Sequence, residues 1–149
     1  MSDDSNRIDV TRRQLLRGAV AAAAATGATS ALANCSGGGS GLVDAGAVSV
    51  YTVGTYRSVS NVIVGRDAMG IYAYSNVCTH EACMVPPPAS QTALSECPCH
   101  MSTYDSNGVV QTGSLATRNL AHYAVTINSG NVMVDTSMSV PATSRTPAA

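Results

Sequence analysis

The strongest constraint on this chain is the crowding of its cysteines and histidines into one short stretch. The sequence contains five cysteines and three histidines, and six of these eight residues fall within the 23 positions from 78 to 100. They are Cys78, His80, Cys83, Cys97, Cys99 and His100. Thiolates and imidazoles are ligands for zinc and iron, so this stretch is the first candidate for a metal centre.

The spacing within the stretch indicates which metal centre to expect. Cys78-x-His80 and Cys97-x-x-His100 are separated by 16 residues, and each contributes one thiolate and one imidazole. Two Cys and two His can hold a structural zinc, but the common zinc spacings place both Cys first and both His second. One Cys and one His from each loop suits a binuclear cluster, with one iron on the thiolates and the other on the imidazoles. The residues alone favour the cluster and leave a zinc-binding β-module as a remote alternative.

The rest of the chain is typical of an all-β domain. Short apolar runs broken by turn residues recur along it, among them NVIVG, GIYAYS, YAVTI and VMVDT. No helical periodicity appears after the N-terminal segment. We expect about seven to nine short strands over residues 47–136. Residues 137–149 lack a hydrophobic pattern, and we expect them to form a loose, disordered tail.

The charge of the chain excludes a nucleic-acid partner. The sequence has eight basic residues, all arginine, against nine acids, and its net charge is -1. A nucleic-acid surface needs clustered Lys or Arg to neutralise phosphates, and no such cluster is present. We find no nucleophile, acid–base pair or second cofactor motif. Chemistry on a substrate is therefore expected to belong to another chain.

At the Cys/His stretch, the chain resembles the Rieske iron–sulfur family. CTHEAC and CPCHMSTYD are similar to the family's two boxes, usually C-T-H-x-G-C and C-P-C-H-G-S-x-Y/F-D. The resemblance spans most of residues 47–136 and implies an antiparallel β-sandwich with a cluster-binding subdomain formed by two loops. It implies one [2Fe-2S] cluster per chain, with Cys78 and Cys97 on one iron and His80 and His100 on the other.

The resemblance also implies roles for the other residues of the boxes. Cys83 and Cys99 are expected to form a disulfide that joins the loops. Respiratory and arsenite-oxidase types have this bond, whereas Rieske ferredoxins and ring-hydroxylating oxygenases lack it, and it suits an exported protein. Ser102 is expected to donate a hydrogen bond to a bridging sulfide, and Tyr104 to the Sγ of Cys78. Both bonds should raise the reduction potential.

Several positions depart from the family pattern. Ala82 and Met101 replace glycines, and a side chain at either position adds strain if the backbone there needs a positive φ. Glu81 stands where quinol-oxidising members usually carry an apolar residue, and burying a carboxylate in an apolar quinone pocket is costly. The segment GSLATRNL, residues 113–120, resembles the loop that covers the cluster, with Ser114 in place of its first proline.

The first 34 residues have the plan of an export signal. Arg12 and Arg13 precede an apolar stretch over residues 18–33, an arrangement that resembles a twin-arginine signal. That route carries folded proteins with cofactors already inserted, which agrees with a cluster protein. The apolar stretch is 16 residues long, short of the roughly 20 that span a bilayer, yet an uncleaved segment can still serve as an anchor.

The junction after this segment leaves the processing open. Ala31-Leu32-Ala33 is an A-x-A cleavage site, whereas LANC followed by SGGGSG resembles a lipoprotein box with its tether. Cys35 is the candidate lipidation site, because it would otherwise be an odd thiol in an exported protein. Residues 35–46 are expected to form a Gly/Ser-rich tether.

The leading functional hypothesis is an exported one-electron carrier, periplasmic or on the outer face of the inner membrane. It would act as the small subunit or partner of a membrane-associated respiratory oxidoreductase, similar to arsenite oxidase. The electron partner would be a cytochrome c or a larger oxidoreductase subunit. The alternative is the quinol-oxidising iron–sulfur subunit of a cytochrome bc complex, in which His80 or His100 accepts the quinol hydrogen.

Overall fold

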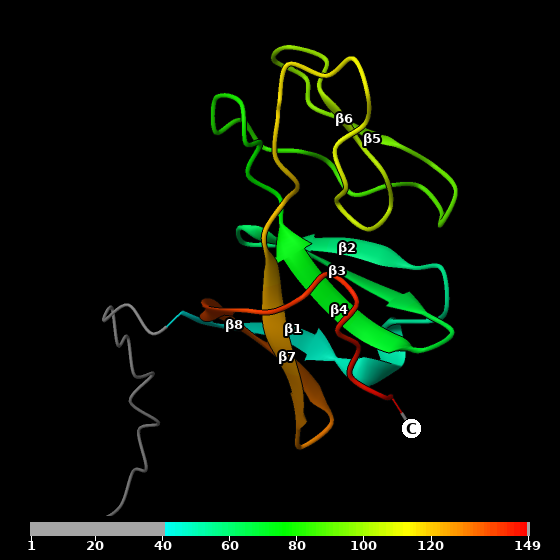
Figure 1. Ribbon diagram of the computed structural model, residues 1–149. Helices are drawn as coiled ribbons and strands as arrows, with labels where there is room; N and C mark the ends of the chain where they lie inside the picture. The colour runs from blue at the N-terminus through cyan, green and yellow to red at the C-terminus, as the bar shows by residue number, and fades with distance from the viewer. Residues whose placement is uncertain (1–40, 149) are drawn as a thin grey trace, which may run out of the picture. The chain divides into compact units, whose positions relative to one another are not determined.

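The computed structural model describes residues 41–148, so the predicted signal segment 1–34 and Cys35 lie outside the described residues. The described range contains eight strands and one short 3₁₀ helix (Figure 1). In chain order they are β1 (Leu42–Ala47), η1 (Val48–Val50), β2 (Tyr56–Val59), β3 (Val62–Asp67), β4 (Gly70–Ser75), β5 (Ser95–Glu96), β6 (Thr103–Tyr104), β7 (His122–Asn128) and β8 (Asn131–Ser139). Within residues 41–148, no helix is long and apolar enough to cross a membrane.

The strands form two antiparallel sheets. The larger sheet has six strands in the order β1-β8-β7-β4-β3-β2, and β5 and β6 form a separate two-stranded sheet. Figure 1 shows β5 and β6 in a lobe of long loops beyond one end of β4. This arrangement confirms the prediction of an all-β fold with a subdomain built from loops.

The β3–β4 hairpin is the centre of the molecule because it is buried on both faces. All six residues of β4 are buried, as are the first four of β3. A continuous apolar run is typical of a strand that is covered on both sides, whereas a strand with one wet face alternates. The runs NVIVG and GIYAYS therefore reflect the position of these strands between two hydrophobic cores.

Two cores lie on the opposite faces of this hairpin. On one face, Val62 and Val64 pack with residues of β1 and β8, including Ala45 and Val132. Strands β1 and β8 are distant from β3 in the sheet order, so the sheet folds over onto itself as a sandwich. The second core joins the other face to the loop subdomain; its buried members are Ile63, Tyr72, Tyr74, Cys78, Val85, Cys97, Tyr104, Ala116 and Leu120. This core therefore connects the β3–β4 hairpin to the loops that carry the candidate site.

The predicted tether over residues 35–46 is wrong from residue 42 onward. Strand β1 begins at Leu42, which pairs with Asp135 on β8, and Val43 pairs with Val134. The run of Gly and Ser residues ends at Gly41. The apolar residues Leu42 and Val43 that follow it already belong to strand β1. A pairing partner about 90 residues away in the chain decides the boundary, and local composition does not reveal it.

The predicted loose tail over residues 137–149 is also wrong for its described part. Strand β8 continues to Ser139, and Thr146 forms an antiparallel bridge with Ile71. Arg145 lies 3.7 Å above the ring centre of Tyr72 and forms an ion pair with Asp67. Polar and cation–π contacts hold this segment, so the absence of a hydrophobic pattern gave no indication of its order.

Candidate metal centre

Two loops with the same backbone geometry carry the predicted ligands. In the loop from Cys78 to Cys83, the Cys78 amide donates to the Cys83 carbonyl at 2.8 Å and the Ala82 amide to the Cys78 carbonyl at 2.9 Å. In the loop from Cys97 to Ser102, the Cys97 amide donates to the Ser102 carbonyl at 2.8 Å. The Met101 amide donates to the Cys97 carbonyl at 3.0 Å. The two boxes of the sequence are thus two copies of one tight turn.

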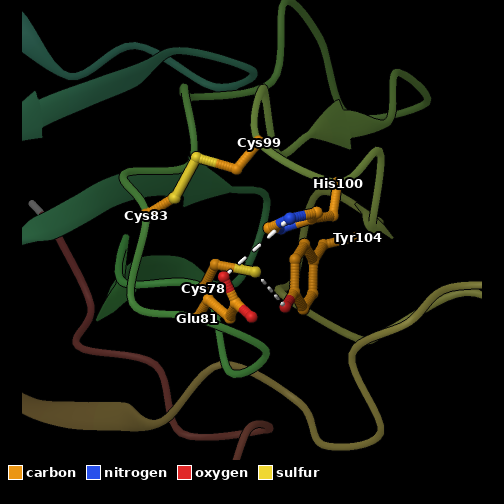
Figure 2. The surroundings of a disulfide bond; sticks show 6 residues. All are labelled: Cys78, Glu81, Cys83, Cys99, His100 and Tyr104. Atoms are coloured by element: carbon orange, nitrogen blue, oxygen red, sulfur yellow. Dashed lines mark hydrogen bonds and ion pairs between the residues drawn. A yellow bond between two sulfur atoms is a disulfide. The ribbon is translucent and has the colours of Figure 1, made fainter.

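The predicted disulfide between Cys83 and Cys99 is present and joins these loops (Figure 2). Its sulfurs are bonded at 2.03 Å and its Cα atoms lie 6.5 Å apart. The Sγ of Cys97 lies within 4.8 Å of both disulfide sulfurs. Because disulfide sulfurs are not thiolates, they are not available as metal ligands, and Cys97 is the one free thiol of this sulfur group.

The four predicted ligands divide into a buried pair and an exposed pair. Cys78 and Cys97 are free thiols with 3% and 1% of their surface exposed. His80 and His100 are exposed, and their ring centres are 4.8 Å apart. This donor set fits a [2Fe-2S] group with an inner iron on two thiolates and an outer iron on two imidazoles. Their role as ligands remains a prediction.

Tyr104 makes the contact that the family resemblance implied. Its buried hydroxyl lies 3.4 Å from the Sγ of Cys78 and accepts a hydrogen bond from the Thr79 amide at 3.2 Å. Burial raises the pKa of Cys78, but hydrogen bonds from Tyr104, from the amides of His80 and Glu81 and from Cys97 together lower it. The arrangement therefore favours a thiolate at Cys78, which is the form that binds metal.

Ser102 is fully buried, and its hydroxyl oxygen accepts a hydrogen bond. The Ser102 Oγ accepts a hydrogen bond from the Ala116 amide at 3.0 Å. The hydroxyl proton is thus free to be donated to another acceptor, as the predicted bond to a sulfide requires. The interaction also connects the second ligand loop to the 113–120 segment.

The 113–120 segment lies against both ligand loops, as the resemblance implied. Ser114, which replaces a proline, accepts a hydrogen bond from the Thr103 amide at 2.9 Å. Thr79 donates to the Arg118 carbonyl at 2.7 Å. Its residues Arg118 and Asn119 line an open groove of about 550 Å³ together with His80. The sequence analysis did not assign roles to Thr79 and Arg118, because a side chain to backbone contact across 39 residues leaves no local pattern.

Glu81 takes a position that the sequence analysis did not foresee. Its Oε2 lies 3.9 Å from the Nε2 of His100, on the other ligand loop (Figure 2). The third histidine of the chain, His122, is buried against the rings of Tyr72 and Tyr74, and its Nε2 lies 2.8 Å from the Asn107 carbonyl oxygen.

A profile of the Rieske [2Fe-2S] domain family matches residues 41–127, more than half of the sequence. The chain belongs to the Rieske family. A Rieske domain binds a [2Fe-2S] cluster, and the protein is accordingly an electron-transfer protein. When bound, the cluster takes up and releases single electrons.

The curated relatives of this Rieske protein include iron-sulfur subunits of cytochrome b6-f complexes. It is 40% identical over 73 residues to the cytochrome b6-f complex iron-sulfur subunit of Synechococcus sp. strain CC9605, a match that covers 49% of this chain and 40% of the relative. The corresponding subunit of Synechococcus elongatus is 45% identical over 69 residues, which cover 44% of this chain and 36% of the relative. The chain thus matches well under half of the length of these relatives.

Some solved structures are also similar to this chain. The cyanobacterial plasma membrane Rieske protein PetC3 from Synechocystis PCC 6803 aligns with 25% identity and a TM-score of 0.49, covering 62% of this chain and 98% of that one. The ferredoxin of carbazole 1,9a-dioxygenase from Nocardioides aromaticivorans IC177 aligns with 24% identity and a TM-score of 0.44, covering 63% and 96% of the two chains.

Proposed function

We propose that this Rieske protein is an exported one-electron carrier that serves a membrane-associated respiratory oxidoreductase of the arsenite-oxidase type. In this proposal Cys78 and Cys97 hold the inner iron, and His80 and His100 hold the outer iron. The observation that carries it is the Cys83–Cys99 disulfide between the two ligand loops. A structural disulfide persists in an oxidising compartment such as the periplasm, which supports a carrier that works outside the cytoplasm.

The exposure of the two imidazoles indicates at which end of the cluster electrons would be exchanged. The thiols are buried, whereas His100 has 41% of its side chain exposed. Electrons would therefore enter and leave at the histidine end, by contact with a cytochrome c or a larger oxidoreductase subunit. Glu81 gives this end a negative charge, which suits a charged protein surface better than an apolar quinone pocket.

A second candidate is a quinol-oxidising subunit of a cytochrome bc complex. The specific observation in its favour is the likeness to cytochrome b6-f iron-sulfur subunits, at 40% identity over 73 residues. In this role an exposed His80 or His100 would accept the quinol hydrogen. Glu81 opposes it, because the carboxylate beside His100 would have to lose its water in the quinone pocket.

Electron-donor kinetics separate the two candidates. The experiment uses the purified cluster-loaded protein, oxidised at the start, and follows reduction by a short-chain quinol or by a reduced c-type cytochrome. The respiratory-carrier proposal expects fast, salt-dependent exchange with a cytochrome and little direct reduction by quinol. Fast reduction by quinol that Glu81→Leu accelerates further would favour the second candidate. Analysis of iron and acid-labile sulfide would identify a zinc module, because such a module would contain zinc and neither iron nor sulfide.

Export by the twin-arginine route is the remaining part of the proposal. Its support is the segment with Arg12 and Arg13, followed by an apolar stretch and Cys35. The test is cell fractionation of the full chain and of an Arg12→Lys, Arg13→Lys double variant. We expect the wild type in the periplasmic or membrane fraction and the variant in the cytoplasm. Incorporation of labelled palmitate that Cys35→Ser abolishes would show lipidation.

A further inference from the structure

The carboxylate of Glu81 faces one nitrogen of a predicted iron ligand. The Oε2 of Glu81 lies 3.9 Å from the Nε2 of His100, with 62% and 41% of the two side chains exposed (Figure 2). Because Nε2 is the nitrogen turned toward Glu81, Nδ1 is the nitrogen left for a metal. A histidine that binds a metal through one nitrogen usually donates the other N–H to a carboxylate, a carbonyl or water.

The two residues come from different loops that a covalent bond holds together. Glu81 lies two residues before Cys83, and His100 directly follows Cys99 in the sequence. The Cys83–Cys99 disulfide therefore limits how far the carboxylate and the imidazole can separate. Among residues 41–148, this is the one close contact between a carboxylate and an imidazole; the ion pair in this range joins Arg145 and Asp67.

The charge of Glu81 should affect the reduction of the predicted cluster in the opposite direction to the hydrogen-bond donors around it. The Tyr104 hydroxyl lies within hydrogen-bond distance of the Cys78 Sγ and can donate to it once Cys78 is a thiolate, and donors to sulfur stabilise the added negative charge of a reduced cluster. A carboxylate is a negative charge beside the same centre, so it disfavours an incoming electron. It also makes the imidazole a stronger donor to iron, which stabilises the oxidised state.

We propose that Glu81 is a positioning residue that holds the outer nitrogen of His100 and lowers the reduction potential of the cluster. This inference rests on the proposed function, in that His100 must be an iron ligand. The magnitude is modest because both side chains are partly in water, where ion pairs are weak and salt screens them. We expect the reduction equilibrium constant to change by roughly three- to tenfold, which is about 30 to 60 mV for one electron.

The test is the midpoint potential of the cluster-loaded full chain, measured at low and at high ionic strength. Glu81→Gln keeps the shape and removes the charge, and it should raise the potential by about this amount at low salt and by less at high salt. Glu81→Asp keeps the charge and should lie between the wild type and Glu81→Gln. Asp135→Asn is the matched control, since it removes one carboxylate from β8 of the sheet, and it should leave the potential unchanged.

The outcomes distinguish this inference from the proposed function. A rhombic EPR signal of a reduced [2Fe-2S] cluster in both proteins, with the same midpoint for Glu81→Gln and wild type at low salt, would overturn the role of Glu81 alone. An equal shift in Asp135→Asn would also overturn it, because the effect would then be one of net charge. A wild-type chain that assembles no cluster would overturn the ligand assignment, and this inference with it.

Discussion

Ala82 and Met101 occupy equivalent places in the two ligand loops, and each donates its amide to the carbonyl of the cysteine four residues earlier. Both have a positive φ, 55° for Ala82 and 57° for Met101. The left-handed conformation costs a residue with a Cβ roughly 1 to 2 kcal/mol. The family pattern has glycine at both positions, and here the same turns are made with side chains present.

Replacing either residue by glycine should therefore stabilise the protein. Ala82→Gly and Met101→Gly relieve the left-handed strain. The greater conformational entropy that glycine gives the unfolded chain lowers the free energy of unfolding by roughly 0.5 to 1 kcal/mol. We expect a net gain of about 0.5 to 1 kcal/mol for each variant in urea denaturation. Ala89→Gly is a control at an exposed loop position without a positive φ, and it should lower stability. A loss of stability in both loop variants would show that these turns are not strained.

The sequence was sufficient to predict the parts of this fold that are marked by a recognisable pattern, either a local run of residues or a family motif. The all-β class followed from short apolar runs, and the partnership of Tyr104 with Cys78 followed from family motifs. The disulfide between Cys83 and Cys99 also followed from the motifs.

The features that the sequence did not reveal depend on contacts between distant residues. Strand β1 exists because β8 pairs with it, and the C-terminal segment is ordered because Arg145 contacts Tyr72 and Asp67. The pair of Glu81 and His100 is likewise a contact between loops. In each case one partner has no local pattern, so the interaction becomes visible only in three dimensions.

Loss of the disulfide should destabilise the fold by unlinking the two ligand loops. Cys83 and Cys99 are 16 positions apart, and closing a loop of about 15 residues is worth about 3 kcal/mol in the chain-entropy description. We expect a Cys83→Ser, Cys99→Ser double variant to lose about this much free energy of unfolding. Reducing agent should lower the stability of the wild type but not of the variant. Equal stability of the two proteins under oxidising conditions would contradict this account.

Acidification should destabilise the protein first through His122. Burial lowers the pKa of His122 below its ordinary value of 6.5; the Asn107 carbonyl and Asp105 oppose this shift and the charge of Arg145 adds to it. The unfolded chain therefore takes up a proton on this residue before the folded one does. Stability should fall as the pH drops below about 6.5. His122→Gln, which does not titrate, should show a smaller loss between pH 7.5 and pH 5 in urea denaturation.

A second loss should follow at lower pH through Asp67. Burial raises the pKa of this carboxyl, but hydrogen bonds from Arg145 and from the amides of Met69 and Gly70, with the charge of Arg145, together lower it below 3.8. The unfolded state is then protonated first, so stability present above about pH 4 is lost as the pH falls further. Asp67→Asn should remove this dependence and leave the one at higher pH unchanged. An identical acid profile for wild type and Asp67→Asn would exclude the ion pair as its source.

Tyr104 should raise the potential of the cluster, and removing its hydroxyl should lower it. The hydroxyl lies 3.4 Å from the Sγ of Cys78, in a buried position where a hydrogen bond to sulfur is little weakened by water. Tyr104→Phe loses this donor, so the reduced cluster loses one stabilising contact. We expect a drop on the order of 60 mV, equivalent to a tenfold change for one electron, in an EPR-monitored redox titration.

The control for this prediction is a second buried tyrosine with the same change. Tyr51 belongs to the core on the other face of the β3–β4 hairpin, and its hydroxyl donates to the Ala45 carbonyl at 2.7 Å. Tyr51→Phe removes a buried hydroxyl without touching either ligand loop, so it should cost stability and leave the potential unchanged. If the two variants shifted the potential equally, loosening of the fold would explain the effect. A drop confined to Tyr104→Phe would tie it to the bond between the hydroxyl and the Cys78 sulfur.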